Sequence, residues 1–591
     1  MRLVALALSF VAATCLVAAP FAVARAAVVD VAALIGQLGD DDYAVREAAA
    51  EQLATLGPEA ADALLSAAES TADLEVALRA RWLVEALPLA STADPPAVAA
   101  ILDRYSRGDV DTRVQLMHRL LRLDDDAGIE PLARIVRQER SAAGSRIAAA
   151  LLAREWHHDD PAWGFLAVRI TPGIGPGVRP TARLLRALAG PISPAAIDEA
   201  VAAVRLLERP DAGGPRGAAD DDAVADEKTS RIFRRVLVEL LASAGRREEA
   251  VAEAAALVAA CRGSTAEEDL LATELAWLTD HGLPEAAGLV TDRTTAATGE
   301  AFFPLVAYAA AVAQRRIGDE AAAAALAGRA AEAFADAEMD LGRRLQAAML
   351  LARWGADEWA LAEYRGIVDA PAAKGDDRCL AAILAAEFLH DHGRDAEAAA
   401  MMQLVLDSRA ADSDQILLRL DRDPKAMRSR MLYFLACDAA ARGDAAAHRE
   451  RLEESLTAHG RDVDSLIAWH RLAADDPGRR EEAARRVARA VEELDEFVLA
   501  TPDDPNSYNE YAWLVANTEG DVQKAVRYSK RSLELSFDSA SYLDTLAHCR
   551  AAAGDAAGAY RTQLLAAGHE PHNVTIRRNL QRFRAALQPQ P

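Results

Sequence analysis

The spacing of apolar positions follows a helical period along most of the chain. Short apolar segments, of which residues 31–35 (Val-Ala-Ala-Leu-Ile) are the first after residue 30, end at Gly, Asp or Pro, and many consist largely of alanine, the strongest helix former. No long run rich in Val, Ile and Thr alternates between apolar and polar positions as a half-buried strand does. The pattern predicts an all-α fold.

An arginine recurs at a nearly constant interval in the N-terminal part of the chain. Arg46, Arg79, Arg113 and Arg146 are separated by 33, 34 and 33 residues. A period of this length predicts stacked helix pairs, because one pair can bury its apolar face only against the next pair. The spacing therefore predicts an α-solenoid with one helix pair in each repeat.

These residues resemble HEAT-type repeats, in which an Asp and an Arg near the start of the second helix form a structural ladder between neighbouring repeats. Asp42 and Asp109 precede their arginines by four residues and match that Asp. The resemblance is best in the first unit and implies a HEAT-like domain over residues 27–155.

Residues 156–230 lack this period. They contain a glycine-rich segment at 172–177 and an acidic, Pro/Gly-rich segment at 209–222, with helical patterns at 181–189 and 195–207 between them. We expect a connector with a flexible acidic spacer between two solenoid halves.

A second period begins near residue 231. Glycines follow one another at intervals of 37, 36, 37 and 38 residues, and five residues after each glycine a small residue opens the next helix. Small residues before these glycines let the two helices of a hairpin cross closely. The pattern resembles the tetratricopeptide repeat and implies degenerate repeats over residues 231–500. The glycines are Gly245, Gly282, Gly318, Gly355 and Gly393.

The resemblance to the tetratricopeptide repeat is strongest at residues 501–591. Two glycines stand 34 residues apart there, and three alanines stand at the consensus intervals of 12 and 7 residues, with a proline five residues later. The resemblance implies a well-formed pair of repeats followed by a C-terminal helix. The matching positions are Gly520, Gly554, Ala547, Ala559, Ala566 and Pro571.

In tetratricopeptide repeats the first helix of each unit lines a concave groove, so the resemblance implies a candidate protein-binding surface on the last two units. Amide, carboxylate and indole groups there can hydrogen-bond an extended peptide backbone. In the other interpretation, Asn509 and Asp544 tie adjacent helices together through buried hydrogen bonds. The candidate groove residues are Asn506, Asn509, Trp513, Asn517, Ser541, Asp544 and His548.

Residues 1–26 have the pattern of an export signal peptide. Arg2 precedes a long uncharged stretch, and the small residues Ala24 and Ala26 stand where signal peptidase reads, so we expect cleavage near Ala26. The same stretch is long enough for an uncleaved membrane anchor, and Cys15 is a candidate for lipidation. We expect an exported bacterial protein of the periplasm or cell envelope, without membrane insertion after cleavage.

The net charge argues against one class of partner, and the spacing of the cysteines argues against a zinc site. The 591 residues carry 66 basic against 91 acidic side chains, a net charge of -25, which repels phosphate backbones and argues against nucleic acid as a partner. The cysteines after residue 26 are widely spaced and form no CxxC or Cys/His cluster, so we expect semi-buried thiols and no zinc site. They are Cys261, Cys379, Cys437 and Cys549.

Sequence motifs of catalysis are absent from the chain. It contains no GK[ST] phosphate loop, no GxSxG elbow and no HExxH helix, and Pro571 interrupts the nearest match, at residues 569–572. The glycines of segment 173–177 are wrongly spaced for a dinucleotide fingerprint. We therefore expect no enzymatic activity and no cofactor.

Two short His/Asp clusters carry metal-ligand chemistry. They are residues 157–160 (His-His-Asp-Asp) and residues 390–392 (His-Asp-His). Residues two apart on a helix point to opposite sides, so we expect polar helix ends there rather than metal sites.

The architecture favours a non-enzymatic scaffold that binds protein or peptide partners. The alternative is a structural subunit of a cell-envelope assembly in which copies of the chain associate with one another.

Overall fold

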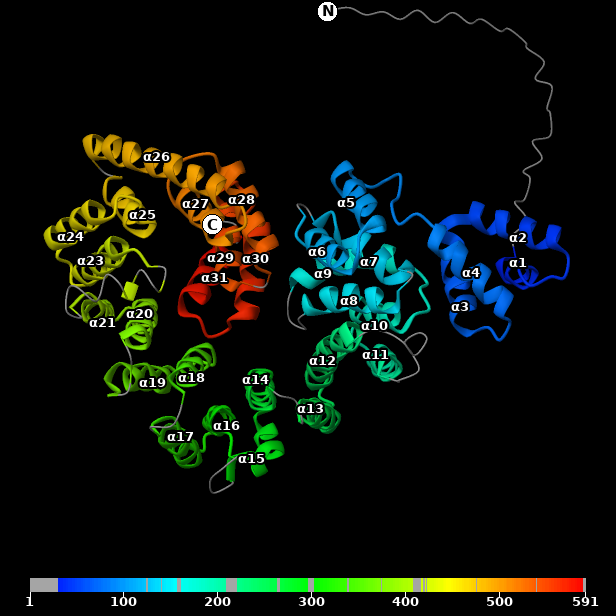
Figure 1. The fold of residues 1–591 in the computed structure, drawn as a ribbon, viewed down its shortest axis with the longest axis horizontal. Helices are drawn as coiled ribbons and strands as arrows, with labels where there is room; N and C mark the ends of the chain where they lie inside the picture. Colours follow the sequence, from blue (N-terminus) through cyan, green and yellow to red (C-terminus); the bar gives the residue numbers. More distant parts are fainter. Residues whose placement is uncertain are drawn as a thin grey trace, which may run out of the picture. The chain divides into compact units, whose positions relative to one another are not determined.

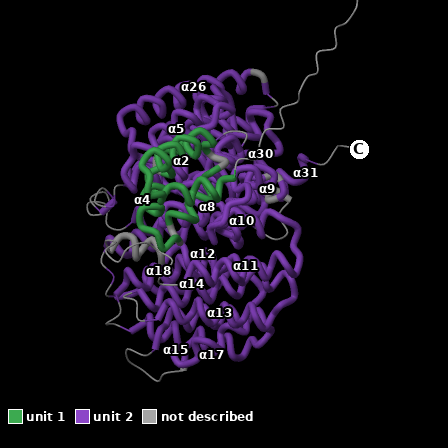
Figure 2. Tube along the Cα trace, turned by 90° about the vertical axis from the view of Figure 1, so that its right-hand side faces the viewer, with its two compact units in different colours: residues 1–88 green, residues 89–591 purple. Residues whose placement is uncertain are grey.

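The computed structural model describes the chain from residue 30 to residue 587, apart from internal gaps. The predicted signal peptide, the 157–160 cluster and most of the acidic spacer lie outside the described residues. The chain forms two compact units, coloured separately in Figure 2, and their boundary between Pro88 and Leu89 falls inside the predicted HEAT-like domain. The internal gaps are residues 124–125, 140, 157–160, 209–219, 263–265, 296–301, 337–339, 372, 374, 408–415, 418–419, 421, 475 and 538.

Unit 1 is a small helical body with its own apolar core, which includes Leu34, Leu53, Leu64 and Leu83. Aspartates cap α1, α2 and α4, as at Asp73, whose carboxylate accepts a hydrogen bond from the Glu75 amide at 2.9 Å. The elements are α1 (Val31–Gln37), α2 (Tyr43–Leu56), the 3-10 helix η1 (Gly57–Ala60), α3 (Ala61–Ser70) and α4 (Leu74–Ala86).

Unit 2 continues as stacked helices, shown in chain order in Figure 1. Its first part contains α5 (Pro96–Arg107), α6 (Val110–Leu121), α7 (Ile129–Gln138), α8 (Ala142–Arg154), α9 (Pro161–Ile174), α10 (Pro180–Ala189), α11 (Pro194–Leu207) and α12 (Asp220–Ser243). The middle part contains α13 (Arg247–Cys261), α14 (Glu267–Asp280), the 3-10 helix η3 (Pro284–Val290), α15 (Thr291–Thr295), α16 (Pro304–Ile317), α17 (Glu320–Phe334), α18 (Leu341–Arg353), α19 (Asp357–Asp369), α20 (Gly375–Asp391) and α21 (Asp395–Asp407). The last part contains α23 (Pro424–Ala441), α24 (Ala445–Ala458), α25 (Val463–Leu472), α26 (Pro477–Ala500), α27 (Pro505–Asn517), α28 (Val522–Leu535), α29 (Ala540–Ala552), α30 (Ala556–His569) and α31 (Val574–Ala586).

The all-α solenoid of stacked helix pairs is confirmed. Pairs such as α16 with α17, α18 with α19, and α29 with α30 pack against each other, and the described residues contain no strand. The chain is thus built of helical hairpins, as both sequence periods predict.

The predicted turn glycines join the two helices of a pair. Gly318 between α16 and α17 has φ +93°, and Gly355 between α18 and α19 has φ +71°. A residue with a side chain is strained in this left-handed region, so glycine is favoured at the turn. The period of the glycines in the sequence therefore marks the positions of these hairpin turns. The small residues that follow these glycines, Ala323 and Ala360, are buried where the two helices cross.

The arginines of the N-terminal period reach neighbouring repeats. Within unit 1, Arg79 Nη1 lies 2.9 Å from Glu47 in the preceding helix pair. Within unit 2, Arg113 Nη1 lies 3.6 Å from Glu139 of the following pair, and Arg146 is buried. Arg46, Arg79 and Arg113 thus pair with glutamates between repeats, whereas Arg146 donates hydrogen bonds to the Leu207 carbonyl and to Thr229 and Ser230.

The two aspartates of that period cap helices. Asp42 Oδ1 accepts a hydrogen bond from the Ala44 amide at 2.8 Å, and Asp109 Oδ1 accepts one from the Thr112 amide at 2.9 Å. Each aspartate fixes the start of its helix, α2 or α6. The HEAT-like assignment of residues 27–155 stays a prediction.

Helices also occupy the segment predicted as a connector. The helical patterns at 181–189 and 195–207 correspond to α10 and α11. The glycine-rich segment at 172–177 follows and partly belongs to α9, which packs on α7. Because α9 is a helix, the strand that a dinucleotide fingerprint needs before its glycines is missing here.

Some contacts within unit 2 join elements that are far apart in the sequence. Arg561 of α30 pairs with Asp126 at 2.5 Å, and the rings of His118 and Phe537 stack with centroids 3.9 Å apart. Repeats in a solenoid usually contact only their neighbours. These long-range contacts therefore add stability to the last two repeats, and the sequence periods do not predict them.

None of the described helices combines the length and the apolar character that a helix needs to cross a membrane.

Candidate protein-interaction surface

The first helices of the repeats in the C-terminal half of unit 2 are α20, α23, α25, α27 and α29, and we call them the first-helix row. Within the row, α25 packs against α27, and α27 packs against α29. A polar side chain caps the N-terminus of four of these helices. Each cap fixes the residue at which its helix begins and therefore which side chains share a face. The caps are Asp423, Asp462, Asp504 and Ser539.

Three of the predicted groove residues come together between α27 and α29. The rings of Trp513 and His548 have centroids 4.7 Å apart. Asn517 Oδ1 accepts hydrogen bonds from His548 Nδ1 at 3.2 Å and from Arg471 at 3.0 Å. Indole, imidazole and amide groups of successive repeats are thus linked in one polar network.

The network extends along the first-helix row beyond the predicted residues. Trp513 Nε1 donates a hydrogen bond to Asp464 Oδ1 of α25 at 3.0 Å. Arg430 of α23 pairs with the other oxygen of Asp464 and, at 2.7 and 2.8 Å, with both oxygens of Glu387 on α20. The row therefore carries a continuous chain of contacts from α20 to α29.

Asp464 is held ionised in this network. Loss of water contact by itself raises its pKa, but the Arg430 guanidinium and the hydrogen bond from Trp513 outweigh that effect, so the pKa of Asp464 is lowered. The carboxylate stays negative at neutral pH and anchors both partners.

Asp544 is a structural residue in this arrangement. Its side chain is 7% exposed, and its Oδ1 accepts hydrogen bonds from Gln563 of α30 at 2.6 Å and from Asn579 of α31 at 2.9 Å. Burial raises the pKa of Asp544, and the two amide donors offset part of that effect. Asp544 ties three helices together, as the second interpretation of the sequence expects.

His548 is also covered by the C-terminal helix. It is 4% exposed, and the ring of Phe583 on α31 meets it edge to face at 5.2 Å. Burial lowers the pKa of His548 to about 3, so the imidazole is neutral near pH 7. A ring so enclosed packs within the repeat and does not reach a partner.

The remaining predicted residues are more accessible. Asn506 is exposed and its Nδ2 donates a hydrogen bond to Glu510 at 3.3 Å, and Ser541 is exposed at the start of α29. Asn509 is half-buried, and its carbonyl oxygen accepts no hydrogen bond from a described residue. Asn509 Oδ1 and His548 Nε2 are thus buried atoms of predicted residues that have no hydrogen-bond partner among the described residues.

A cavity of about 500 Å³ lies where α18 and α20 face the loop between α30 and α31. The cavity is lined by Met349 and Arg353 of α18, Asp391 at the end of α20, His392 directly after it, and His572 of the loop. Because α20 also carries Glu387, the cavity adjoins the end of the first-helix row. A volume of this size accommodates several side chains of a bound peptide.

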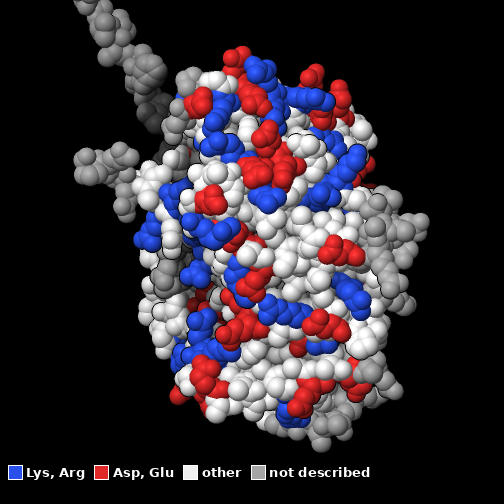
Figure 3. All heavy atoms as spheres, turned by 90° about the vertical axis from the view of Figure 1, so that its left-hand side faces the viewer, with Lys and Arg blue, Asp and Glu red and all other residues white. Residues whose placement is uncertain are grey.

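Charges of both signs are mixed on the second helices. Figure 3 shows basic and acidic side chains interspersed on the face it draws. Arg451 pairs with Glu454 on α24 at 2.6 Å, and Arg485 pairs with Glu481 on α26 at 2.7 Å. The linked polar and aromatic groups thus lie on the first helices, where they are partly buried.

The chain was compared with protein-family models, with curated protein sequences and with solved structures. No protein-family model matches the chain, and no curated protein sequence matches it. Solved structures do match, all at low sequence identity.

The matching structures contain helical repeats. A complex of Naa15 and Naa10 bound to HypK-THB matches at 18% identity and a TM-score of 0.20, with 71% of this chain and 64% of that chain covered. The tetratricopeptide domain of P58(IPK) matches at 13% identity and a TM-score of 0.16, with 67% and 98% covered. A signal-transduction ATPase with a tetratricopeptide repeat sensor from Pyrococcus horikoshii matches at 13% identity and a TM-score of 0.17, with 89% and 74% covered.

This chain thus covers just under two thirds of the first of these structures. TM-scores this low carry no argument about the fold of this chain or about what it binds.

Proposed function

We propose that this protein is a non-enzymatic scaffold that binds an extended segment of a partner protein along the first-helix row. The observation that carries the proposal is the continuous set of polar and aromatic contacts from α20 to α29, which adjoins the 500 Å³ cavity. Successive first helices present such groups at the spacing of the repeats, which suits a long ligand better than a compact one.

The chemistry of the row fits a peptide backbone. Asn506 offers an exposed amide, and the enclosed carbonyl oxygen of Asn509, which accepts no hydrogen bond from a described residue, becomes available when this half-buried side chain turns outward. An extended peptide has one donor and one acceptor per residue that such amides can pair. Met349 in the cavity, 50% exposed, supplies apolar area for a side chain of the partner.

The state of the histidine in the row argues against a catalytic role for this residue. His548 is neutral and enclosed between Trp513 and Phe583, so it cannot exchange a proton with a substrate at the surface.

The proposal includes action outside the cytoplasm, in the periplasm or cell envelope. Its support is the sequence pattern of residues 1–26. N-terminal sequencing of the native protein tests this part, because a start at or near Ala27 is expected and a retained Met1 in a cytoplasmic fraction would contradict it.

A library of random linear peptides tests the binding function. We expect the full chain to enrich peptides whose affinity falls at least about tenfold in Met349→Glu, because a charge then enters the cavity. Leu404→Glu is the matched control, since Leu404 is 51% exposed and lies on the second helix α21. Equal binding by both variants, or no enriched peptide, would contradict the proposal.

A further inference from the structure

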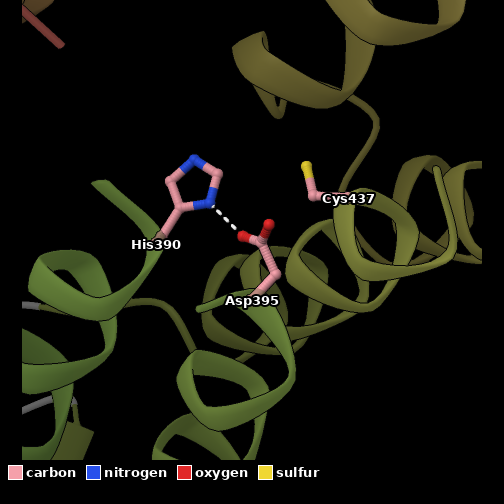
Figure 4. Close-up of side chains that lie close together, drawn as sticks. All are labelled: His390, Asp395 and Cys437. Atoms are coloured by element: carbon pink, nitrogen blue, oxygen red, sulfur yellow. Dashed lines mark hydrogen bonds and ion pairs between the residues drawn. The ribbon is translucent and has the colours of Figure 1, made fainter. Parts of the chain in front are cut away.

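Three potential metal ligands from different helices meet beside the first-helix row. His390 lies in the last turn of α20, Asp395 in the first turn of α21 and Cys437 in α23. Figure 4 shows the imidazole, the carboxylate and the thiol facing a common space. His390 Nδ1 and Asp395 Oδ1 are 2.5 Å apart, and the ligand atoms of all three residues lie within 4.8 Å of one another.

The fold explains why these residues meet. Gly393, with φ +71°, turns the chain sharply between α20 and α21 and brings His390 and Asp395 to one side of the hairpin. Helix α23 packs against α21 and adds Cys437. The thiol is 42 residues from Asp395 in the sequence, so no short spacing motif announces the group.

The charges around the three residues favour a cation. Four carboxylates, those of Glu387, Asp391, Asp462 and Asp464, interact electrostatically with His390 or with its neighbour Arg430. Together with Asp395 they make five carboxylates against the single guanidinium of Arg430. Asp391 also accepts a hydrogen bond from Thr575 at 3.3 Å.

We propose that His390, Asp395 and Cys437 form a three-ligand site for a divalent transition metal, with Zn²⁺ as the preferred ion. Nitrogen, oxygen and thiolate donors together suit Zn²⁺, whereas Mg²⁺ and Ca²⁺ take oxygen ligands. Three protein ligands leave a fourth tetrahedral position for water or for a donor from a bound partner.

Binding requires a small movement and one proton transfer to solvent. Ligands of tetrahedral Zn²⁺ lie about 3.3–3.8 Å apart, so the side chains contract around the ion by roughly 1 Å at the longest separation. Burial raises the pKa of the Cys437 thiol to about 12, and Zn²⁺ displaces that proton when it binds the sulfur. The His390–Asp395 hydrogen bond gives way to two metal bonds.

The site would link adjacent repeats. Because α20 and α21 belong to one helix pair and α23 opens the next, an ion held by all three adds a bond between the pairs. Metal binding that spans two elements stabilises the folded state, since the unfolded chain does not gather the ligands.

Cobalt spectroscopy on the metal-free full chain tests the proposal, with Co²⁺ as the probe. We expect a thiolate-to-cobalt charge-transfer band that Zn²⁺ abolishes by displacement, and an increase in melting temperature with Zn²⁺. Cys437→Ser should remove the band, and His390→Gln should weaken Co²⁺ binding at least about tenfold.

Two controls separate this site from adventitious binding. Cys379→Ser changes a thiol on α20 and His392→Gln changes an imidazole just after the end of α20; both residues lie outside the three-residue group, and both variants should keep the band. Circular dichroism confirms that each variant is folded, and His390→Gln remains informative if Cys437→Ser does not fold. No band in the wild-type chain, or a band retained in folded Cys437→Ser, would overturn the proposal.

Discussion

Asn509 and Asp544 occupy corresponding places in two successive repeats, and their surroundings differ. Asn509 on α27 is half-buried, and its carbonyl oxygen accepts no hydrogen bond from a described residue. Asp544 on α29 is buried and accepts hydrogen bonds from Gln563 and Asn579. The second donor comes from α31, which packs against α29 and α30.

The difference shows how a helix at the end of a repeat array changes the surroundings of polar residues on the first helix that it covers. Where α31 covers a first helix, polar residues of the groove become internal ties between helices. On α27, the residue in the same sequence position has a carbonyl oxygen that pairs with no described residue. Terminal repeats of solenoids need such a cap because their last apolar face has no neighbour.

Removing the cover should have the largest effect. Phe583 of α31 is buried and packs on His548 and Ala547. We expect Phe583→Ala to lower the free energy of unfolding of this region by about 3–5 kcal/mol, the usual range for a buried Phe. Urea unfolding followed by Trp513 fluorescence measures the loss. Leu587→Ala is the control, because Leu587 is 41% exposed.

Asp544 should come next in the order of effects. Asp544→Ala leaves the amides of Gln563 and Asn579 buried without their acceptor, so we expect a loss of about 1–3 kcal/mol. Asp544→Asn keeps a carbonyl oxygen and removes a buried charge, and it should be as stable as the wild type or more stable at neutral pH. Thermal melts of both variants check this, and equal destabilisation by Ala and Asn would contradict it.

His548 should make the covered region sensitive to acid. Its pKa is about 3 in the folded chain and 6.5 without burial, so the unfolded chain binds one more proton between these values. Stability is therefore lost as pH falls below about 6.5, by about 1.4 kcal/mol between pH 7.5 and pH 5.5. His548→Gln should remove this loss, as denaturant unfolding at both pH values would show.

His392 provides a control of opposite sign. Its hydrogen bond with Asp357 raises the pKa of the imidazole, so its contribution is complete at low pH and is lost as pH rises through the folded value. His392→Gln should therefore make the chain less stable at low pH. A shift in the same direction for both variants would contradict the assignment of His548 as a buried neutral ring.

The fold was largely predictable because its determinants are local. A glycine such as Gly318 is needed where the backbone turns with φ +93°, and a small residue such as Ala323 is needed where two helices cross. A glycine with positive φ recurs in several hairpins after residue 231, at Gly245, Gly318, Gly355, Gly393 and Gly554, so the period there reports the architecture directly. The boundary at Pro88 depends on how many contacts cross it, which no local pattern encodes.

The candidate surface was predictable only in part. The resemblance to tetratricopeptide repeats identified Trp513 and His548, but not Arg430 and Asp464, whose roles depend on helices that lack a clear repeat signature. Cys437 was considered apart from His390 because the two are 47 residues apart, and only the packing of α23 on α21 brings them together. Contacts between residues so far apart in the sequence produce no recognisable spacing motif.

Asn509 should give the smallest change in stability and therefore decides whether the uncovered repeat binds a ligand. Removing a buried acceptor that has no donor does not destabilise the fold, so Asn509→Ala should alter the free energy of unfolding by less than about 0.5 kcal/mol. We expect the side chain to turn outward when a peptide binds, so peptides selected on the wild-type chain should bind Asn509→Ala about tenfold more weakly, because the bound backbone loses this acceptor.

The neighbouring amide supplies the comparison for that measurement. Asn506 is exposed and already bonded to Glu510, so Asn506→Ala should leave stability unchanged and weaken peptide binding less than Asn509→Ala does. Fluorescence anisotropy with one labelled peptide measures both affinities. If Asn509→Ala melts as low as Asp544→Ala, then Asn509 is a structural tie like Asp544, and the contrast between the two repeats fails. If Asn509→Ala keeps both its stability and its affinity, the partner backbone does not pair with α27.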